Sequence, residues 1–459
     1  MRKIVYVILI AVGAFMSHSC AYILDKEPIS SLNTGNYWQT DADINSAVSA
    51  MYVSFASAMA RGYYDWGEVR GRCYEPYQSA SKVQELLSNN IPTDNSACLW
   101  THLYKTINQA ALIIRYVPQM TGASASLRTQ ALGEAYAMRA LSYFYAVRVW
   151  GNVPLFKEAV EEYDIDTCLK EKESMQKVLD FIETDLKEAE KHFPTVYSTV
   201  NRKRANLGLV FALMMDVAAW RHDYASVISV YENKVKSLSS AAFAFSDFKA
   251  DEVSEQWVDR WRSIVQEGTE DKEVFMMVHY DKLTDDTTNY TRTYFCSSGE
   301  MLKVSDETLS LFEPDDIRRA GTFAEDAKTI AKLEKFWARG NASISDYYSD
   351  NDLIMYRYTD IMLLYAEALN EVGGRESEAV TVVNRIRQRA GTSVVSPEGK
   401  EAVRESVLLE RKLELLGEGK YWFDLIRMGK TESEANCPES KIFFPISITH
   451  QLSNPLLNK

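Results

Sequence analysis

Side chains that could carry out catalysis are scattered along this sequence rather than grouped. None of the six histidines lies within three to five residues of another, and neither H-E-x-x-H nor G-x-S-x-G occurs. These absences disfavour a compact zinc site and a serine nucleophile elbow. Gly429-Lys430-Thr431 resembles the end of a phosphate-binding loop, but Asp424 stands where the first glycine should be. A helical pattern also precedes it, instead of the strand that such a loop requires.

The acidic residues leave one catalytic alternative open. Some pair among the 64 aspartates and glutamates could serve as the acid and base of a glycoside hydrolase. No spacing singles out such a pair, and runs such as Glu161-Glu162 are typical of a solvated face. We therefore predict a protein that is not an enzyme and that uses no metal and no cofactor. An all-α glycoside hydrolase is the catalytic alternative.

Aromatic side chains offer a different chemistry, the stacking of rings on a ligand. The chain contains 26 Tyr, 18 Phe and 9 Trp, together 12% of its residues. They are dense in two stretches that lack helical periodicity, residues 61–80 and 238–350. Long irregular segments on a rigid scaffold often carry function. We predict that both stretches are loop-rich and that the second contains short strands, such as residues 273–280.

The overall composition is that of a globular protein. The 459 residues are 46% hydrophobic and 25% charged, which is enough to bury a large core. The formal net charge of −13 disfavours nucleic acid as a partner, because phosphate binding needs clustered positive charge. The six cysteines include no C-x-x-C pair, so a zinc ribbon or a thioredoxin-type centre is disfavoured. Their disulfide pairing stays open.

The N-terminus has the features of an export signal. A charged start precedes an apolar run from Ile4 to Met16, which is too short to span a membrane. Small residues lead up to Cys20, which favours a lipoprotein signal over a plain secretory one. We predict that residues 1–19 are a signal peptide and that residues 20–459 form a single domain. Acyl chains on Cys20 would anchor this domain to a membrane without spanning it.

Helical periodicity dominates the rest of the chain. Between residues 127 and 149, apolar or small residues recur at steps of three and four, which marks one face of a helix. Gly151 and Pro154 then stop this helix. The same kind of pattern predicts helices over residues 127–149, 174–192, 205–220, 225–236, 361–372, 377–390 and 401–416.

The predicted helices follow one another in pairs that read as antiparallel. Leu207-Gly208 followed by Phe211 matches the first half of a tetratricopeptide repeat, and Ala189 with Pro194 matches the second half of an earlier unit. We therefore predict a mainly α fold. Its core would be a scaffold of tetratricopeptide-like helix pairs, each burying its face against the next.

A series of short motifs runs through nearly the whole mature chain in a fixed order. They are Leu24-Asp25-Lys26-Glu27-Pro28, Asn36-Tyr37-Trp38, Arg139-Ala140-Leu141-Ser142-Tyr143-Phe144-Tyr145, Trp150-Gly151-Asn152-Val153-Pro154-Leu155, Arg357-Tyr358-Thr359-Asp360, Tyr365-Ala366-Glu367-Ala368-Leu369-Asn370, Asn384-Arg385-Ile386-Arg387-Gln388-Arg389-Ala390-Gly391, Glu410-Arg411, Trp422-Phe423-Asp424-Leu425 and Phe444-Pro445-Ile446. In this order and spacing they resemble the SusD/RagB family of Bacteroidetes surface lipoproteins, and the C-terminal half is closest.

The shared motifs are expected to be structural rather than catalytic. Charged residues in a packed scaffold are normally paired, so we expect buried or half-buried hydrogen-bonded pairs between helices. Tyr421 stands where the family usually has Arg, and Ser447 where it usually has Pro, so a salt bridge at these two positions is in doubt. The residues expected to form buried pairs are Asn384, Arg387, Glu410, Arg411 and Asp424.

The resemblance implies a function in nutrient uptake. It implies a non-catalytic, lipid-anchored protein on the cell-surface side of the outer membrane, which binds glycans and delivers them to a SusC-like TonB-dependent transporter. A sugar ring suits an aromatic site, because a Tyr or Trp face covers its C–H face while polar side chains bind its rim. A peptide-binding, RagB-like lipoprotein is the main alternative, and a repeat adaptor that binds only proteins is another.

The family's ligand surface is built from loops early and midway in the chain, which correspond to the two aromatic stretches. Core packing is the competing interpretation for every ring. An acidic glycan would need a patch of basic side chains. Arg61, Arg70 and Arg72 are the nearest candidate cluster for such a patch. The predicted ligand-binding residues are Tyr63, Tyr64, Trp66, Arg70, Arg72, Tyr74, Tyr77, Tyr290 and Tyr294, with Trp257, Trp261, Tyr347 and Tyr348 as further candidates.

Overall fold

The computed structural model describes most of the chain after residue 36. The described residues are 37–77, 81–161, 165–197, 199–238, 240–247, 271–280, 289–295, 301–323 and 352–458, with 256, 258, 260, 261 and 264. The predicted signal peptide and Cys20 lie outside them, as do Trp257, Tyr347 and Tyr348. Within the described ranges, no helix combines the length and the apolar character needed to cross a membrane.

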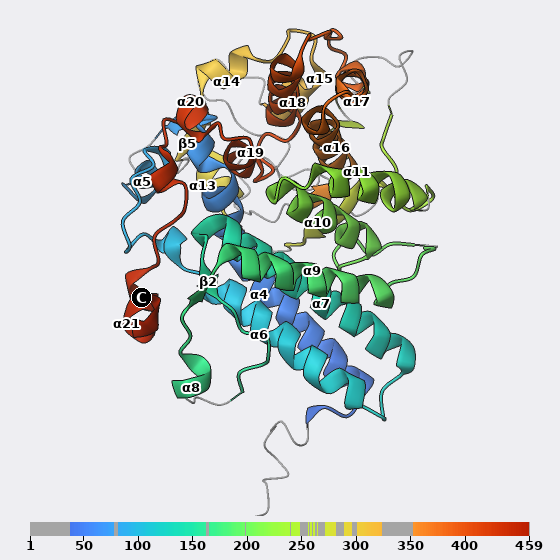
Figure 1. The fold of residues 1–459 in the computed structure, drawn as a ribbon, viewed down its shortest axis with the longest axis vertical. Coiled ribbons are helices and arrows are strands. Elements are labelled where there is room, and N and C mark those ends of the chain that lie inside the picture. The colour runs from blue at the N-terminus through green and yellow to red at the C-terminus, as the bar shows by residue number, and fades with distance from the viewer. Residues whose placement is uncertain are drawn as a thin grey trace, which may run out of the picture.

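Four long helices lie side by side in the lower part of Figure 1. Helix α4 (Asp41–Gly67) packs on α6 (Thr101–Tyr116), α6 packs on α7 (Ala125–Trp150), and α7 packs on α9 (Met175–His192). Neighbours cover the C-terminal half of α7 on every side, so that half is buried all round.

A second group of helices continues the stack in the upper part of Figure 1. Helix α10 (Leu207–Trp220) contacts α9 and α11 (Tyr224–Asn233), and α11 contacts α16 (Tyr358–Val372). Helices α17 (Glu376–Arg389) and α18 (Lys400–Glu414) pack on α16 and on each other. Each helix thus buries its apolar face against the next, and the predicted mainly α fold is confirmed.

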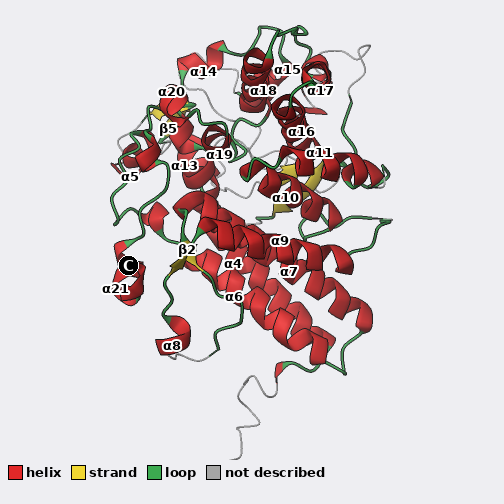
Figure 2. Cartoon of the chain, in the orientation of Figure 1, coloured by secondary structure: helices red, strands yellow, loops and turns green. Residues whose placement is uncertain are grey.

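The strands are short and occur in antiparallel pairs. Among the described residues they form three two-stranded sheets, coloured yellow in Figure 2. The pairs are β1 (Tyr74–Pro76) with β5 (Leu302–Val304), β2 (Val153–Pro154) with β3 (Lys172–Glu173), and β4 (Val274–Val278) with β6 (Leu353–Arg357).

Short helices connect these elements. The α-helical ones are α5 (Ser81–Leu87), α8 (Ile165–Cys168), α13 (Thr291–Phe295), α14 (Asp306–Ser310), α15 (Ile317–Thr322), α19 (Tyr421–Arg427), α20 (Thr431–Ala435) and α21 (Ile448–Ser453). The 3-10 turns are η1 (Val69–Gly71), η2 (Ser96–Cys98), η3 (Val117–Gln119), η4 (Val235–Ser237), η6 (Glu439–Lys441) and η7 (Pro455–Asn458).

All seven helices predicted from periodicity are present, with ends within three residues of those predicted. The prediction of a loop over residues 61–80 is wrong for its first part, because residues 61–67 are the last turns of α4. Every residue from Gly62 to Gly67 is buried, so this end of the helix has no polar face and no visible period. Gly67 is required there, since a Cβ would overlap the carbonyl oxygen of Gly419.

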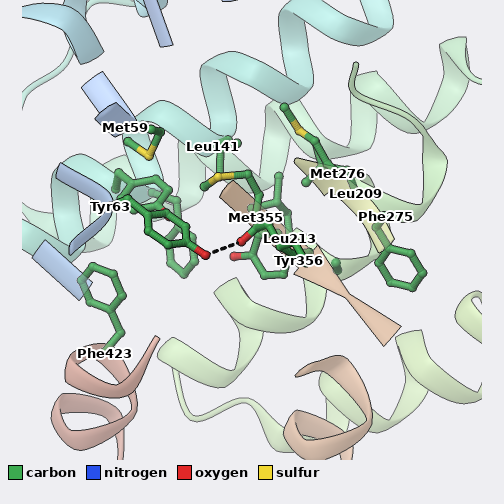
Figure 3. Packing of buried hydrophobic residues seen from close by; sticks show 14 of the residues in the cluster. Met59, Tyr63, Leu141, Leu209, Leu213, Phe275, Met276, Met355, Tyr356 and Phe423 are labelled. Atoms are coloured by element: carbon green, nitrogen blue, oxygen red, sulfur yellow. Dashed lines mark hydrogen bonds between the residues drawn. The ribbon is translucent and has the colours of Figure 1, made fainter. Parts of the chain in front are cut away.

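The aromatic C-terminal end of α4 packs into the core, as Tyr63 shows (Figure 3). Its ring lies in the buried cluster that also contains Leu141 of α7, Leu213 of α10 and Phe423 of α19. Its hydroxyl donates a 2.8 Å hydrogen bond to the carbonyl of Ile354 in β6. The N-terminal helix is therefore tied to the C-terminal half of the chain through its own side chains.

Buried charges hold the C-terminal half together. Glu414 of α18 pairs with Arg318 (Nη1–Oε2 3.0 Å), with Arg357 (Nη1–Oε1 2.7 Å) and with Arg389. Arg357 also pairs with Glu273 at 2.7 Å and with Glu418 at 2.8 Å. None of these side chains is more than 2% exposed. We call the set Arg318, Arg357, Arg389, Glu273, Glu414 and Glu418 the charge network.

The expected pairs between helices are confirmed for Arg387, Glu410, Arg411 and Asp424, whereas Asn384 bonds to a loop instead. Arg411 Nε lies 2.8 Å from Asp424, and Arg387 Nη1 lies 3.1 Å from Glu410. The Asn384 amide makes two 2.8 Å hydrogen bonds with the backbone of Val395, which fixes the loop after α17.

The two departures from the family pattern have local structural roles. The buried Tyr421 ring packs against the backbone of Gly71, with the Lys412 ammonium 5.0 Å from its centroid. The Ser447 hydroxyl accepts a hydrogen bond from the Thr449 backbone N–H and caps α21.

Candidate ligand-binding site

The two aromatic stretches meet in space. Strands β1 and β5 pair so that Tyr74 lies opposite Val304 and Pro76 opposite Leu302. The hydroxyls of Tyr64 and Thr291 are 2.7 Å apart. We call this contact of residues 61–77 with residues 289–295 and 301–304 the junction. Segments more than 200 residues apart in the sequence therefore lie against each other.

Most of the rings at the junction point inward. Tyr64 and Tyr74 both pack on Phe295, with ring centroids 5.2 and 5.0 Å away. The Trp66 indole N–H donates to the carbonyl of Ala97 at 2.8 Å. Such enclosed rings cannot stack on a ligand that arrives from solvent, and their burial stabilises the fold instead. The expected exposure is therefore wrong for five rings, Tyr63, Tyr64, Trp66, Tyr74 and Tyr294, each at most 4% exposed.

Arg70 is also part of the interior. Its guanidinium lies 4.0 Å from the ring centroid of Trp422 and donates 2.7 and 2.6 Å hydrogen bonds to the carbonyls of Ile442 and Lys441. It thus joins the end of α4 to the C-terminal segment. The expected basic patch of Arg61, Arg70 and Arg72 does not form, because Arg70 is fully buried and Arg61 is paired with Asp65.

Three predicted ligand-binding residues remain accessible, namely Arg72, Tyr77 and Tyr290. Arg72 is exposed beside β1, and Tyr77, at the end of β1, is 44% exposed. Tyr290 is 39% exposed and precedes α13. The Tyr77 N–H donates to the carbonyl of Met301, so this ring is held at the β1–β5 edge of the junction.

Tyr290 is the exposed ring with the most defined surroundings. Its backbone N–H donates a 2.8 Å hydrogen bond to the carbonyl of Ala60 in α4. Its ring packs on Tyr294, with centroids 6.1 Å apart, and Arg61 lies 5.5 Å from its centroid. One side of the ring therefore belongs to the aromatic cluster while the other part faces solvent. We call Tyr64, Tyr74, Tyr290, Tyr294 and Phe295 the aromatic cluster.

Arg61 is held in place by a buried acid. Its Nε donates to Asp65 at 2.6 Å, one turn further along α4, and the Tyr294 hydroxyl donates to the same carboxylate. Burial raises the pKa of Asp65, and the charge of Arg61 lowers it in part. Arg61 itself stays 28% exposed at its side chain, so it offers a fixed cationic donor beside the Tyr290 ring.

The same face of α4 leads from Tyr290 to a groove. Tyr52, Ala56 and Ala60 are four residues apart and share one helix face. Tyr280 at the end of β4 donates to the carbonyl of Ala56 at 2.7 Å, one turn before the Tyr290 contact. The groove, which we call the α4 groove, has a volume of about 530 Å³. It is lined by Tyr52, Val53 and Ala56, by Lys203 and Arg204, and by Met276 to His279.

The remaining candidates do not extend this surface. Trp261 is 1% exposed, packs over Gly321 and points its indole N–H toward Thr322, so it belongs to the core rather than to a ligand surface. Within the part of the chain that the structure describes, no group of three or more His, Cys, Asp or Glu side chains is arranged to hold a metal ion.

The sequence analysis missed the α4 groove. Its cationic side comes from Arg202-Lys203-Arg204, a run of three basic residues in an acidic chain, and that run was the available signal. Arg202 turns inward and donates to the carbonyls of Val274 and Ala242 at 2.8 Å, so only the other two line the groove.

Comparison with protein families finds two matches along the chain. Residues 280–442 match the SusD family model, and residues 23–214 match a second SusD-like model, described as starch-binding associating with outer membrane. Among curated proteins, the chain is 29% identical to SusD-like protein P38 of Formosa agariphila, over 100% of this chain and 98% of that protein. It is 24% identical to SusD-like protein P25 of the same organism, over 93% of this chain and 89% of the relative.

Solved structures share the fold. A SusD homolog from Bacteroides thetaiotaomicron superposes with a TM-score of 0.77 at 23% identity, covering 92% of this chain and 98% of that one. The protein NanU of B. fragilis gives 0.77 at 20% identity, covering 94% and 98%. Surface glycan-binding protein A from Bacteroides uniformis gives 0.75 at 20% identity, covering 91% and 98%.

Proposed function

The chain belongs to the SusD/RagB family, and on this premise we propose that it is a non-catalytic, surface-anchored lipoprotein that binds glycans. It holds an oligosaccharide at the junction and delivers it to a SusC-like TonB-dependent transporter. The names of its relatives support this proposal, since one structural neighbour is a surface glycan-binding protein and one matching family model is described as starch-binding.

Tyr290 carries the proposal. Its ring is 39% exposed although its backbone is fixed to α4 and its inner side packs on Tyr294. A rigid ring of this kind loses little conformational entropy when it stacks on the C–H face of a sugar. Arg61 stands beside it as a donor for sugar hydroxyls. The α4 groove continues the surface from Ala60 toward Ala56, about 6 Å away at the rise of an α-helix.

The lipid anchor and the transporter follow from the N-terminal sequence and from the family. Cys20 comes four residues after the end of an apolar run that fits an export signal, and acylation there would hold the protein at the outer membrane. Cys20→Ser is expected to move the protein from the membrane fraction to the soluble fraction. Affinity purification from detergent-solubilised outer membranes is expected to recover a large β-barrel protein together with the wild-type chain.

A glycan array with the purified mature chain tests the binding role. We expect Tyr290→Ala to weaken binding of its best glycan by about tenfold, because one aromatic contact is worth about 1 kcal/mol or more. Ile448→Ala, which removes a similarly exposed apolar side chain (41%) from α21, is the matched control and should bind like the wild type. Peptide binding without any glycan binding would favour the RagB-like alternative. Release of sugar from a bound glycan would instead establish an enzyme.

A further inference from the structure

The α4 groove is not the only hollow beside Arg204. A second one, of about 680 Å³, lies between the start of α7 and the end of α9 and includes Gln130, Lys191 and Tyr197. The two hollows share Asn201 and Arg204 at their common border. Each volume lies in the range of ligand sites. We call the two hollows together the basic groove.

Charge distinguishes the basic groove from the rest of the surface. The chain carries a formal net charge of −13, yet among the residues that the structure describes no Asp or Glu lines either hollow. The acids that contact its cations lie behind them or at the rim. Glu134 and Asp352 have fully buried side chains, and Glu188 pairs with the exposed Lys191. The groove therefore presents hydrogen-bond donors to a ligand, while the carboxylates that fix Lys203 and Arg204 are buried.

Arg204 is fixed at the border of the two hollows. Its Nε and Nη2 both lie 2.9 Å from the buried carboxylate of Glu134. The Tyr52 hydroxyl and the Gln130 amide donate to that same carboxylate at 3.0 and 2.8 Å. The Arg204 side chain is still 27% exposed. A planar guanidinium held in this way is prepared to bind an anion without further ordering.

Lys203 is fixed by a second buried acid through a histidine. Its ammonium lies 2.9 Å from Nε2 of His279, and Nδ1 of His279 lies 2.7 Å from Asp352. Because a lysine ammonium can only donate, Nε2 must accept and Nδ1–H must donate to the carboxylate. This arrangement uses one of the three ammonium protons. The other two are available to groups that enter the α4 groove.

Aromatic surface lies next to these donors. Tyr52 of α4 and Tyr197 and Phe193 after α9 are half-buried and line the hollows. The Tyr197 hydroxyl accepts from the Leu207 N–H at 3.0 Å, which fixes its ring. Partly exposed rings beside fixed cations suit a ligand that has both an apolar face and a negative group.

From this arrangement we propose that the basic groove is an anion-specific subsite, in which Lys203 and Arg204 bind the carboxylate or sulfate group of an acidic sugar. The proposal rests on the proposed glycan-binding function and specifies its ligand class. The Tyr290 ring, further along the same face of α4, would hold a neighbouring sugar of the same chain. The selected ligand is thus an acidic oligosaccharide rather than a neutral one.

Titration calorimetry of the mature chain with matched pairs of oligosaccharides tests the subsite. One pair is oligogalacturonate and its methyl ester, and the other is chondroitin sulfate oligosaccharide and its chemically desulfated form. We expect at least one acidic probe to bind at least tenfold more tightly than its neutralised or desulfated partner. Lys203→Met should abolish most of that preference, Lys203→Arg should retain it, and Lys82→Met, at an exposed lysine on α5, should leave it unchanged.

The outcomes separate this proposal from the general function. Equal binding within both pairs, no binding of any acidic probe, or a preference that survives Lys203→Met would each overturn the anion subsite. If neutral glycans on the array still bind through Tyr290 in that case, glycan binding stands and only the subsite fails. Comparison of the two pairs shows whether the groove takes a carboxylate or a sulfate. Unchanged thermal unfolding of Lys203→Met excludes a merely structural effect.

Discussion

The charge network and the aromatic cluster both join distant segments of the chain, but they differ in how completely their side chains must be shielded from water. Every carboxylate and guanidinium of the charge network is at most 2% exposed and has opposite charges as partners. In the aromatic cluster, Tyr64 is fully buried while Tyr290 keeps 39% of its surface. An ion removed from water needs complete pairing, whereas a ring can be half covered at little cost. Function can therefore develop at the edge of the aromatic cluster and not within the charge network.

The largest effect is expected when the charge network is broken. Glu414→Ala leaves Arg318, Arg357 and Arg389 with reduced compensation in the interior, so it should lower the free energy of unfolding by about 3–5 kcal/mol. Glu401→Ala on the same helix is the control. Glu401 is 60% exposed, so its pairs with Arg404 and Lys430 are screened by water and should contribute much less than the pairs of Glu414. Urea unfolding measures the free energy of unfolding of both variants. Similar losses would show that the charge network stabilises the fold no more than exposed pairs do.

Acid should weaken the charge network in a defined pH window. Although burial favours its neutral form, the charges of Arg389, Arg357 and Arg318 hold the pKa of Glu414 at about 2. Because this value lies below the pKa of an unfolded glutamate, about 4.3, the stabilisation is complete above that pH and is lost as the pH falls toward 2. The loss amounts to about 3 kcal/mol from this group.

The comparison with Glu414→Gln isolates that group from the other carboxylates. Unfolding free energies of the wild type and of this variant should differ most at pH 7 and converge as the pH falls from about 4.5 toward 2. A difference that stays constant between pH 7 and pH 3 would contradict the assigned pKa. The aromatic cluster gives no such window through Tyr74, since burial raises the pKa of its hydroxyl well above the ordinary tyrosine value.

The same contrast explains what the sequence could predict. Periodicity located α7 and α9 because each has stretches with one apolar face, and family motifs placed Arg411 and Asp424 among the residues expected in buried pairs. Tyr63 and Tyr64 were assigned to a loop surface because glycine and polar neighbours surround them in sequence. Their burial depends on residues such as Ile354 and Thr291, more than 200 positions away. Local sequence does not contain that information.

The basic groove is a site that the local sequence could not predict. Lys203 and Arg204 stand in a visible basic run, but nothing local indicates that Arg202 between Asn201 and Lys203 turns inward. The acids that fix the two exposed cations, Glu134 and Asp352, come from α7 and from the approach to β6. The basic run becomes part of a site only because α4 packs beside these segments.

The smallest expected effect comes from comparing a buried and an exposed member of the aromatic cluster. Tyr64→Phe removes a buried hydroxyl that shares a 2.7 Å hydrogen bond with Thr291, so it should lower the free energy of unfolding by about 1 kcal/mol. Tyr290→Phe removes a hydroxyl from a ring that is 39% exposed, and water can replace its interactions, so stability should change by less than about 0.5 kcal/mol. Chemical denaturation of the two variants, which carry the same atomic change, gives the comparison directly. Equal losses would mean that Tyr290 is as much a part of the core as Tyr64, and its ring would then not be available to a ligand.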